Sequence, residues 1–250
     1  MKQLIFFSLF LFPSLLFAQE TVKKTNDNGK NKEVFYVLKS DKKIKQGPYQ
    51  KFNFAGQLVA EGFYKNGEKD SVWTEYWAAP RVKALGSYAN GKRIGIWQFF
   101  STTGDLQQEY DFTDSVLIAD ETLQSSKSKT FKLIQGTDTI ETTLDRPPVY
   151  IGGKACMQST LIKGITYPRE MFSVRENIVG DVEIEFVVTK DGMAQDFKII
   201  KGVGHGLDEE VLRLSKQISS GWIPAIYKGE TVSVVTGATV NFRMFAAKTN

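Results

Sequence analysis

A repeat of 24 residues in the first half of the chain constrains its fold more than any other feature. The segment GFYKNGEKDSVWTEYW begins at Gly62, and a related segment, GSYANGKRIGIWQFF, begins at Gly86. Four columns of aromatic or aliphatic residues align at this spacing: Tyr49, Trp73 and Trp97; Phe52, Tyr76 and Phe100; Leu58, Val82 and Leu106; Tyr64, Tyr88 and Phe112. Such regular spacing indicates a repeated structural unit rather than the core of a soluble enzyme.

Each repeat unit is predicted to be a β-hairpin. Aromatic residues two or three positions apart suit a pleated surface with one packed face. Asn66-Gly67 and Asn90-Gly91 are typical of tight turns, because both residue types tolerate a positive φ. A single hairpin cannot bury its aromatic face. Successive units are therefore expected to stack into one twisted antiparallel sheet with the aromatic residues as a shared spine.

Residues 45–115 resemble the MORN-like repeats of the YwqK type, in which G-x-Y, N-G-K and G-x-W recur along an extended sheet. The middle unit departs from the pattern at two positions. Ser71 stands where Gly47 and Gly95 stand in the other units, and Pro80 takes the place of a turn glycine and is expected to widen that turn. The resemblance implies an interaction or scaffold surface without a shared chemistry. A sheet with no ligand and a dedicated binding face both remain open.

The N-terminus predicts export. Residues 1–18 are predicted to be a cleaved signal peptide, because an apolar run too short to cross a bilayer comfortably follows Lys2. Residues 19–44 are polar and rich in lysine, and are predicted to form a flexible basic leader and a first strand. The leader could be solvated or could contact anionic lipid or cell-wall polymer. We expect a protein of the periplasm or cell envelope; an uncleaved inner-membrane anchor is the alternative.

Composition argues against several classes of protein. The chain has 250 residues, 42% of them hydrophobic, and a formal net charge of +4, which is too small to indicate nucleic-acid binding. Its single histidine, His205, excludes a multi-histidine metal site. Its single cysteine, Cys156, excludes a disulfide framework and is expected to be buried on the inner side of a short helix with Leu161 and Ile162. No enzyme activity, metal or cofactor is predicted.

One glycine-rich segment imitates a nucleotide-binding loop. Gly202-Val203-Gly204-His205-Gly206 follows an apolar run and precedes a helical pattern. However, Leu207 stands where the last glycine of the dinucleotide motif belongs, and no βαβ crossover is evident. Nucleotide binding is therefore not expected, and Asp208 is predicted to be the N-cap of the following helix.

A linker and a second domain are predicted after the repeats. Residues 116–146 hold a polar stretch and then a hairpin, and Pro147-Pro148 mark the boundary to a domain over residues 147–250. Two apolar sets recur at strand and helix spacing: Val182, Ile184, Phe186 and Val188, and Leu207, Val211, Leu214 and Ile218. The resulting order of helix, strand, strand, helix and strand predicts helices on one side of an antiparallel sheet, so the fold class is α+β.

This second domain resembles the TonB C-terminal domain over residues 147–245. The resemblance rests on short motifs in the family's order: Tyr167-Pro168, Gly180-Asp181-Val182, Asp191-Gly192, Leu207-Asp208, Trp222-Ile223-Pro224-Ala225, Gly229 and Phe242. It implies a small α+β domain with an antiparallel sheet and two helices, and a module that binds protein rather than an enzyme. Domains of this family capture the N-terminal segment of an outer-membrane receptor as an added β-strand.

By this resemblance, the last strand is the candidate edge for a partner strand. Its candidate residues share one face: Val232, Val234, Thr236, Ala238, Val240 and Phe242. The expected partners are envelope proteins, including N-terminal segments of outer-membrane receptors. One alternative is an envelope scaffold, in which the repeat sheet binds cell-wall polymer or assembly partners and the C-terminal domain forms a homodimer. The other is a membrane-anchored TonB-type energy transducer, although the chain lacks that protein's long proline-rich spacer.

Overall fold

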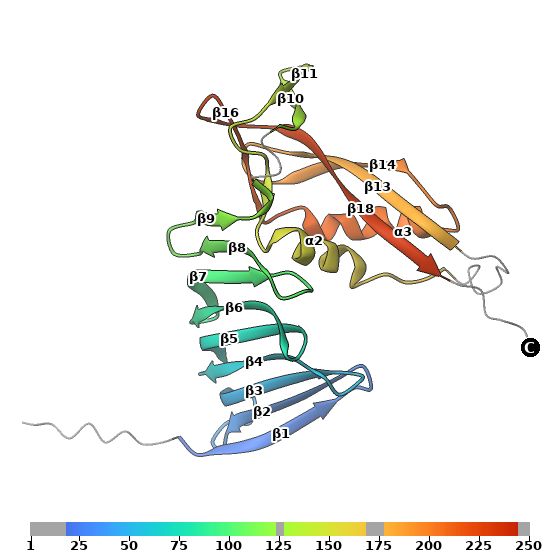
Figure 1. Cartoon of the computed structure of the whole chain (residues 1–250). Coiled ribbons are helices and arrows are strands. Elements are labelled where there is room, and N and C mark those ends of the chain that lie inside the picture. Colours follow the sequence, from blue (N-terminus) through green and yellow to red (C-terminus); the bar gives the residue numbers. More distant parts are fainter. Residues whose placement is uncertain (1–18, 124–127, 169–177, 245–250) are drawn as a thin grey trace, which may run out of the picture.

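The structure is a computed structural model that describes residues 19–123, 128–168 and 178–244. The signal-peptide prediction for residues 1–18 lies outside this part of the chain. The predicted α+β class is confirmed. A long antiparallel sheet in the N-terminal half is followed by a smaller domain, in which two helices lie on one face of a second sheet (Figure 1).

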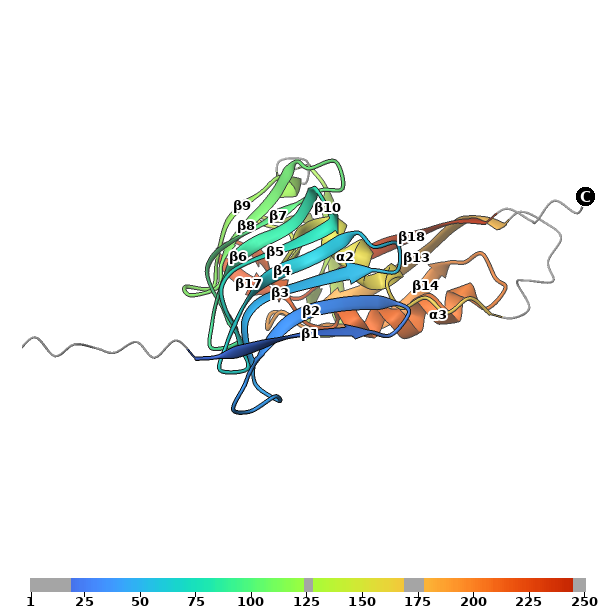
Figure 2. The ribbon, with the colours of Figure 1, turned by 90° about the horizontal axis from the view of Figure 1, so that it is seen from below.

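The N-terminal sheet has nine strands, and each strand pairs with its neighbours in sequence. The strands are β1 (Thr21–Asp27), β2 (Asn31–Leu38), β3 (Lys45–Asn53), β4 (Leu58–Lys65), β5 (Glu68–Ala78), β6 (Arg81–Ala89), β7 (Lys92–Phe100), β8 (Leu106–Asp111) and β9 (Val116–Asp120). Two strands make one 24-residue unit, so the sheet grows by a hairpin with each repeat. Figure 2 shows the stacked strands curving together beside the second domain.

The expectation of a flexible leader is wrong for Thr21–Asp27. This segment is β1, and it pairs with β2 from Thr21 opposite Leu38 to Asp27 opposite Lys32. A turn at Asn28 joins the two strands, and the Asn28 side chain accepts hydrogen bonds from the backbone of Lys30 and Asn31. Val22 is the one apolar residue of the segment, but the backbone of the segment is paired with β2, and this tertiary context overrides its largely polar composition.

The turns of the repeat follow the predicted chemistry at most positions. Asn66 and Gly67 both have positive φ, as do Asn90 and Gly91. Ser71 also adopts a left-handed φ of 60°, so it takes the conformation of the glycines at the equivalent positions. The widened turn expected at Pro80 is wrong: Ala78 pairs with Arg81, which leaves a two-residue turn with a cis Ala79–Pro80 bond.

The C-terminal domain is built on a five-stranded sheet in the order β11-β10-β18-β13-β14. Its strands are β10 (Thr130–Gln135), β11 (Asp138–Thr143), β13 (Ile178–Val188), β14 (Ala194–Lys201) and β18 (Val234–Met244). Two small antiparallel pairs accompany it: β12 (Val149–Tyr150) with β15 (Trp222–Ile223), and β16 (Ala225–Tyr227) with β17 (Glu230–Val232). The helical elements are α2 (Gly153–Ile162), α3 (Leu207–Ser215) and the 3₁₀ turn η2 (Lys216–Ile218). The hairpin predicted within the linker is thus part of the C-terminal sheet.

Both predicted apolar patterns of this domain lie in its core. The four alternating residues of β13, from Val182 to Val188, are at most 1% exposed. The helical set from Leu207 to Ile218 is completely buried, and Leu207, Val211 and Ile218 belong to the same core cluster as the β13 residues. The predicted order of helix, strand, strand, helix and strand is observed as α2, β13, β14, α3 and β18. The amphipathic faces of a helix and a sheet therefore meet as expected from their periods.

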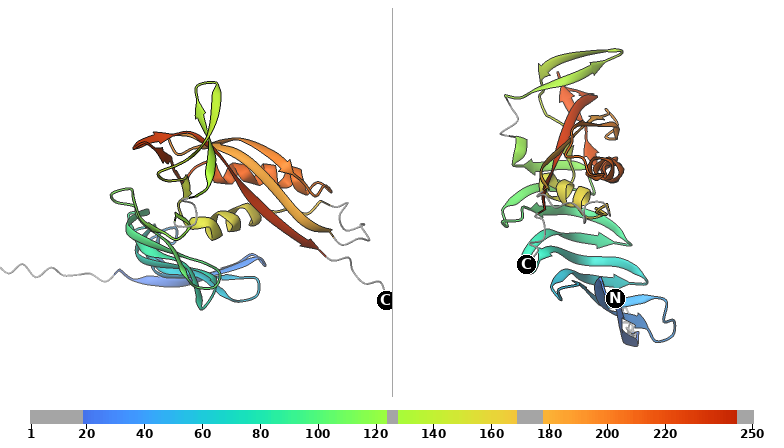
Figure 3. Two further views of the ribbon diagram at one scale, coloured as in Figure 1. Left: turned by 45° about the horizontal axis from the view of Figure 1, so that its top comes forward. Right: turned by 90° about the vertical axis from the view of Figure 1, so that its right-hand side faces the viewer.

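Helix α2 lies between the two sheets (Figure 3). Leu161 and Met157 pack into the C-terminal core, whereas Cys156 packs against the aromatic residues of the nine-stranded sheet. Burial raises the pKa of the Cys156 thiol, which is consistent with an unreactive side chain. The prediction that Ile162 shares this inner side is wrong, because Ile162 is 48% exposed. The helix packs against both cores, so the three residues predicted to share one face, Cys156, Leu161 and Ile162, do not do so.

Candidate functional site

The repeated aromatic residues form a buried row along one face of the nine-stranded sheet. Tyr49, Trp73 and Trp97 are at most 6% exposed. Neighbouring rings meet edge to face along the row, as at Tyr88 and Trp97, whose centroids are 5.1 Å apart. Such contacts add to the stabilisation from burial. These aromatic residues therefore hold the sheet together and do not form an exposed binding platform.

Three cations cover the row at the same spacing of 24 residues. The Lys45 ammonium lies 5.0 Å from the Tyr49 ring centroid, and the Lys69 ammonium lies 4.0 Å from that of Trp73. The Arg93 guanidinium lies 4.2 Å from the centroid of Trp97. These are cation–π distances, and the aliphatic stems also shield the rings from water. The aromatic row is therefore covered by side chains of the protein itself.

The glycines of the C-terminal motifs permit close approaches. A Cβ on Gly180 would lie 2.6 Å from Val203, and one on Gly206 would lie 2.8 Å from Pro168. A Cβ on Gly192 would overlap the backbone carbonyl of Trp222. Pro168 therefore packs against Gly206, a position that only glycine can occupy. Tyr167, the other half of its motif, is 41% exposed. The motif places the tyrosine at the surface and the proline against the domain.

The remaining motif residues secure the strand that follows α3. The Trp222 indole nitrogen donates a hydrogen bond of 2.7 Å to the Ile218 carbonyl, and the Pro224 carbonyl accepts one from Arg146. Trp222 is buried beside Phe186. Asp191 lies in the turn between β13 and β14, which a hydrogen bond from the Gly192 backbone nitrogen to the Thr189 carbonyl closes. These residues make structural contacts within the domain.

The expected N-cap role of Asp208 is wrong. The N-cap of α3 is Gly206, and Asp208 lies within the first turn of the helix. Its carboxylate accepts hydrogen bonds from the backbone nitrogens of Val203 and Gly204, at 2.8 and 3.1 Å. The Asp208 carboxylate thus uses the backbone donors of the glycine-rich segment that imitates a nucleotide-binding loop. The nearby Leu207 is completely buried and anchors the helix in the core.

The candidate partner edge is open over most of β18. One side of the strand pairs with β13 without interruption from Val234 to Met244. On the other side, β10 pairs only with Val234 and Val235. Within the described residues, no backbone hydrogen bond reaches that edge from Thr236 onward. Alternate backbone N–H and C=O groups there point outward, as on any unpaired strand edge.

Two of the six candidate edge residues lie outside this open stretch. Val232 belongs to β17 and pairs with Ala225, and Val234 is covered by β10 opposite Leu133. Thr236, Ala238, Val240 and Phe242 lie on the open stretch, but the last three are at most 9% exposed because their side chains face the core. A strand added here would meet their backbone rather than their side chains. The sequence did not predict that β10 limits the edge, although it did predict the hairpin that contains β10.

The open stretch of β18 differs from the other sheet edges in charge and regularity. From Thr236 to Met244 its one charged residue is Arg243. Strand β14, at the far edge of the same sheet, carries exposed charges at Lys198 and Lys201 and two register irregularities against β13. Charges and bulges protect an edge from pairing with another strand. β18 lacks such protection.

Comparison with known proteins finds a family match for the C-terminal part of the chain. Residues 163–244 match the family model described as Gram-negative bacterial TonB protein C-terminal. This family is a non-enzymatic protein-interaction domain of envelope proteins involved in transport, and its partners are proteins. No curated protein matches the chain. In the part of the chain that the structure describes, no helix is long and apolar enough to cross a membrane.

Proposed function

We propose that the protein is exported to the cell envelope and binds a protein partner by accepting a β-strand along β18, from Thr236 to Met244. The proposal rests on the observation that one edge of β18 is unpaired beyond Val235, whereas its other edge is fully paired with β13. Main-chain hydrogen bonds would supply the affinity of such a complex. The TonB-like domain favours a segment of an outer-membrane receptor as the added strand.

The position of β10 supports a limit at one end of the added strand. β10 runs antiparallel to β18 and leaves it after Val235. The hairpin of β10 and β11 therefore bounds one end of an added strand, next to Thr236. Selectivity for the side chains of the added strand would come from groups on the two faces of the sheet beside this edge. On the outer face these include the ion pair of Lys132 and Glu185, whose charged atoms are 3.8 Å apart.

Hydrogen–deuterium exchange of the full chain tests the proposal. Synthetic peptides with the N-terminal sequences of outer-membrane receptors are added, and exchange of backbone amides is followed by mass spectrometry. We expect slower exchange for residues 236–244 and unchanged exchange for the edge strands β1 and β14, because a new strand protects only the edge it pairs with. Protection of β14 alone, or no protection at β18 at a peptide concentration that saturates binding, would contradict strand addition at this edge.

A crosslinking experiment identifies the partner in the cell. A photo-reactive amino acid is placed at Thr239, on the open stretch of β18, or at Val72, which is 58% exposed on the nine-stranded sheet. Capture of a receptor segment from Thr239 but not from Val72 supports the proposed function. Capture of a second copy of this chain from Thr239 would instead indicate a homodimer.

A further inference from the structure

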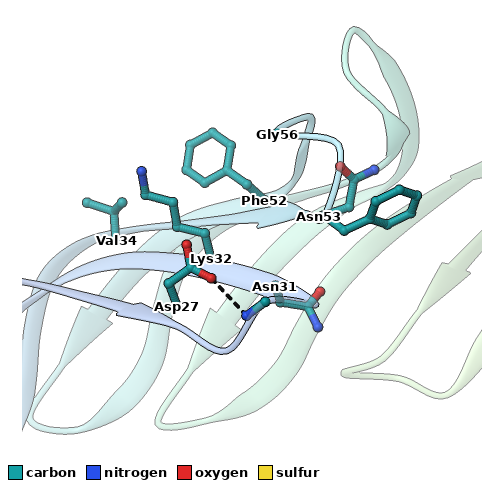
Figure 4. A pocket seen from close by; sticks show the side chains of 9 residues that line it. Asp27, Asn31, Lys32, Val34, Phe52, Asn53 and Gly56 are labelled. Atoms are coloured by element: carbon teal, nitrogen blue, oxygen red, sulfur yellow. Dashed lines mark hydrogen bonds between the residues drawn. The ribbon is translucent and has the colours of Figure 1, made fainter.

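An open pocket of about 470 Å³ lies at the N-terminal end of the nine-stranded sheet, far along the sheet from the C-terminal domain. Asp27, Lys32 and Phe52 stand opposite one another on β1, β2 and β3, so their side chains share one face. Figure 4 shows Lys32 and Phe52 on this face and Asn31 at the adjoining turn. By strand alternation, this face is opposite the buried row that contains Tyr49.

One wall of the pocket is an exposed aromatic ring. Phe54 is 85% exposed, although it is a large apolar residue. The residues one and two repeats later are Ala78 and Thr102, so the repeat itself does not require an aromatic side chain at this position. The turn that carries Phe54 is held by Asn53, whose side-chain oxygen accepts hydrogen bonds of 3.0 Å from the backbone of both Ala55 and Gln57. The ring is therefore presented to solvent by an ordered turn.

Polar groups around the rings are left with free hydrogen-bonding capacity. Within the described residues, the Asn31 carboxamide and the Lys32 ammonium form no hydrogen bond or ion pair. Asp27 uses one carboxylate oxygen to accept from the Gly29 backbone, which leaves the other oxygen available. The pocket thus offers a carboxamide, a cation and a carboxylate oxygen beside two phenyl rings. These groups can donate to or accept from hydroxyl and acetamido groups.

A second hollow extends this surface along the sheet. It has a volume of about 540 Å³, shares Val34 with the first pocket, and is lined by Tyr36 and Phe63. Lys23 also lines it and, like Lys32, has no ion pair within the described residues. Glu61 lines it too, but its carboxylate oxygens already accept hydrogen bonds from the side chains of Tyr76 and Gln50. The two hollows together provide aromatic surfaces and unpaired positive charge over several strands. An extended chain with apolar faces and spaced carboxylates can pack on these rings and pair with the two lysines, while Asp27 and Glu61 disfavour a carboxylate elsewhere on the surface.

We propose that these two hollows bind an acidic glycan built of N-acetylated amino sugars, as in the bacterial cell wall. The C–H face of a sugar ring carries a slight positive charge and packs against the negative face of Phe54 or Phe52. The acetamido group bonds to Asn31, and a carboxylate on the glycan pairs with Lys32 or Lys23. The site is separate from β18, so it goes beyond the proposed function and does not depend on it.

Co-sedimentation of the full chain with purified insoluble peptidoglycan tests this proposal. Phe54→Ala and Asn31→Ala are each expected to weaken binding about tenfold, which corresponds to ~1.4 kcal/mol. Because Phe54 is exposed, its replacement should leave the melting temperature unchanged. Ile118→Ala is the matched control, since Ile118 is 49% exposed on β9 at the other end of the sheet. Failure of the wild type to sediment, or equal sedimentation of Phe54→Ala, would overturn the proposal.

Soluble oligosaccharides identify the chemistry that is bound. Calorimetric titration compares muramic-acid-containing glycan strands, oligomers of N-acetylglucosamine and oligomers of glucose. Lys32→Ala should weaken binding of the acidic strands and leave the neutral amino-sugar oligomers unaffected. Equal affinity for glucose oligomers would refute recognition of the acetamido group, and binding of an apolar peptide in place of any glycan would refute the ligand class. None of these results bears on exchange protection at β18.

Discussion

At the scale of single residues, the repeat depends on a glycine that makes room for a tryptophan. A Cβ on Gly62 would overlap the Trp73 ring, and one on Gly86 would overlap the Trp97 ring. Each indole nitrogen donates a hydrogen bond of 3.1 Å to a carbonyl of the adjacent strand, at Phe63 or Ser87. The two buried tryptophans thus lie flat across the strand that precedes them. This geometry explains why the glycine and the tryptophan recur together.

Replacing Gly62 with alanine is expected to destabilise the protein by about 1–3 kcal/mol, the usual cost of forcing extra volume into a packed site. Urea denaturation at an unchanged m-value measures the loss. Thr25→Ala, at an exposed position on β1, is the control and should change little. In a Trp73→Ala background the cost of Gly62→Ala should shrink, because the overlapping ring is gone. An equal cost in both backgrounds would mean that the strain does not come from the ring.

At the scale of elements, the buried row of the nine-stranded sheet includes tyrosines that must stay neutral. Burial, with a smaller contribution from Glu33, raises the pKa of Tyr49 above its ordinary value of 10.0. Burial likewise raises the pKa of Tyr64, again with Glu33 adding to the effect. The folded protein therefore favours the protonated phenols more than the unfolded chain does. By linkage, their contribution to stability is complete below pH 10 and is lost as the pH rises above it.

We expect the free energy of unfolding to decline as the pH is raised above about 10, the ordinary pKa of tyrosine. Tyr49→Phe should make this decline shallower, because phenylalanine has no proton to lose. Tyr167→Phe is the control, since Tyr167 is 41% exposed, and should leave the slope unchanged. Urea denaturation at a series of pH values gives the slopes. An identical slope for the wild type and Tyr49→Phe would exclude the buried phenol as its source.

The elements differ in how well the sequence predicts them. The hairpins around Asn66-Gly67 and Asn90-Gly91 follow from turn chemistry and aromatic spacing, both of which are local. Strand β1 escapes prediction because all its residues except Val22 are polar, and its stability comes from pairing with β2. The hairpin of β10 and β11 is predictable, but its docking on β18 is not, since only two residue pairs join them. Non-local pairing of this kind leaves no periodic signal in the sequence.

The candidate partner edge could likewise be predicted only in part from the sequence. Alternation along the last strand predicts which side chains face the core, and Ala238, Val240 and Phe242 are indeed buried. Whether a strand edge is free depends on what lies beside it, which alternation cannot reveal. Val234 illustrates this, because it belongs to the predicted set and is nevertheless covered by β10. The pocket beside Phe54 also escapes prediction, since it forms where the turns of separate hairpins come together.

At the scale of the whole molecule, one buried glutamine joins the two sheets. Gln108 lies on β8 and is completely buried. Its side-chain nitrogen donates to the Asp120 carboxylate at 2.7 Å and to the Tyr150 carbonyl at 3.0 Å, and its oxygen accepts from the Gly152 backbone at 2.6 Å. Tyr150 and Gly152 begin the C-terminal domain just before α2. The side chain therefore holds the start of one domain against a strand of the other.

Gln108→Ala is expected to destabilise the protein by about 3 kcal/mol and to separate the unfolding of its two parts. The variant leaves the Gly152 N–H and the Tyr150 carbonyl without their buried partner, and each such group costs about 1–3 kcal/mol. Because the glutamine no longer joins the two domains, differential scanning calorimetry should resolve two transitions where the wild type shows one. Gln98→Ala is the control, because the Gln98 side chain donates a hydrogen bond to Glu109 of its own sheet and, among the described residues, to no group of the other domain, so a single transition should remain. A single transition in Gln108→Ala would show that α2 packing alone couples the domains, since Cys156 would still contact the nine-stranded sheet.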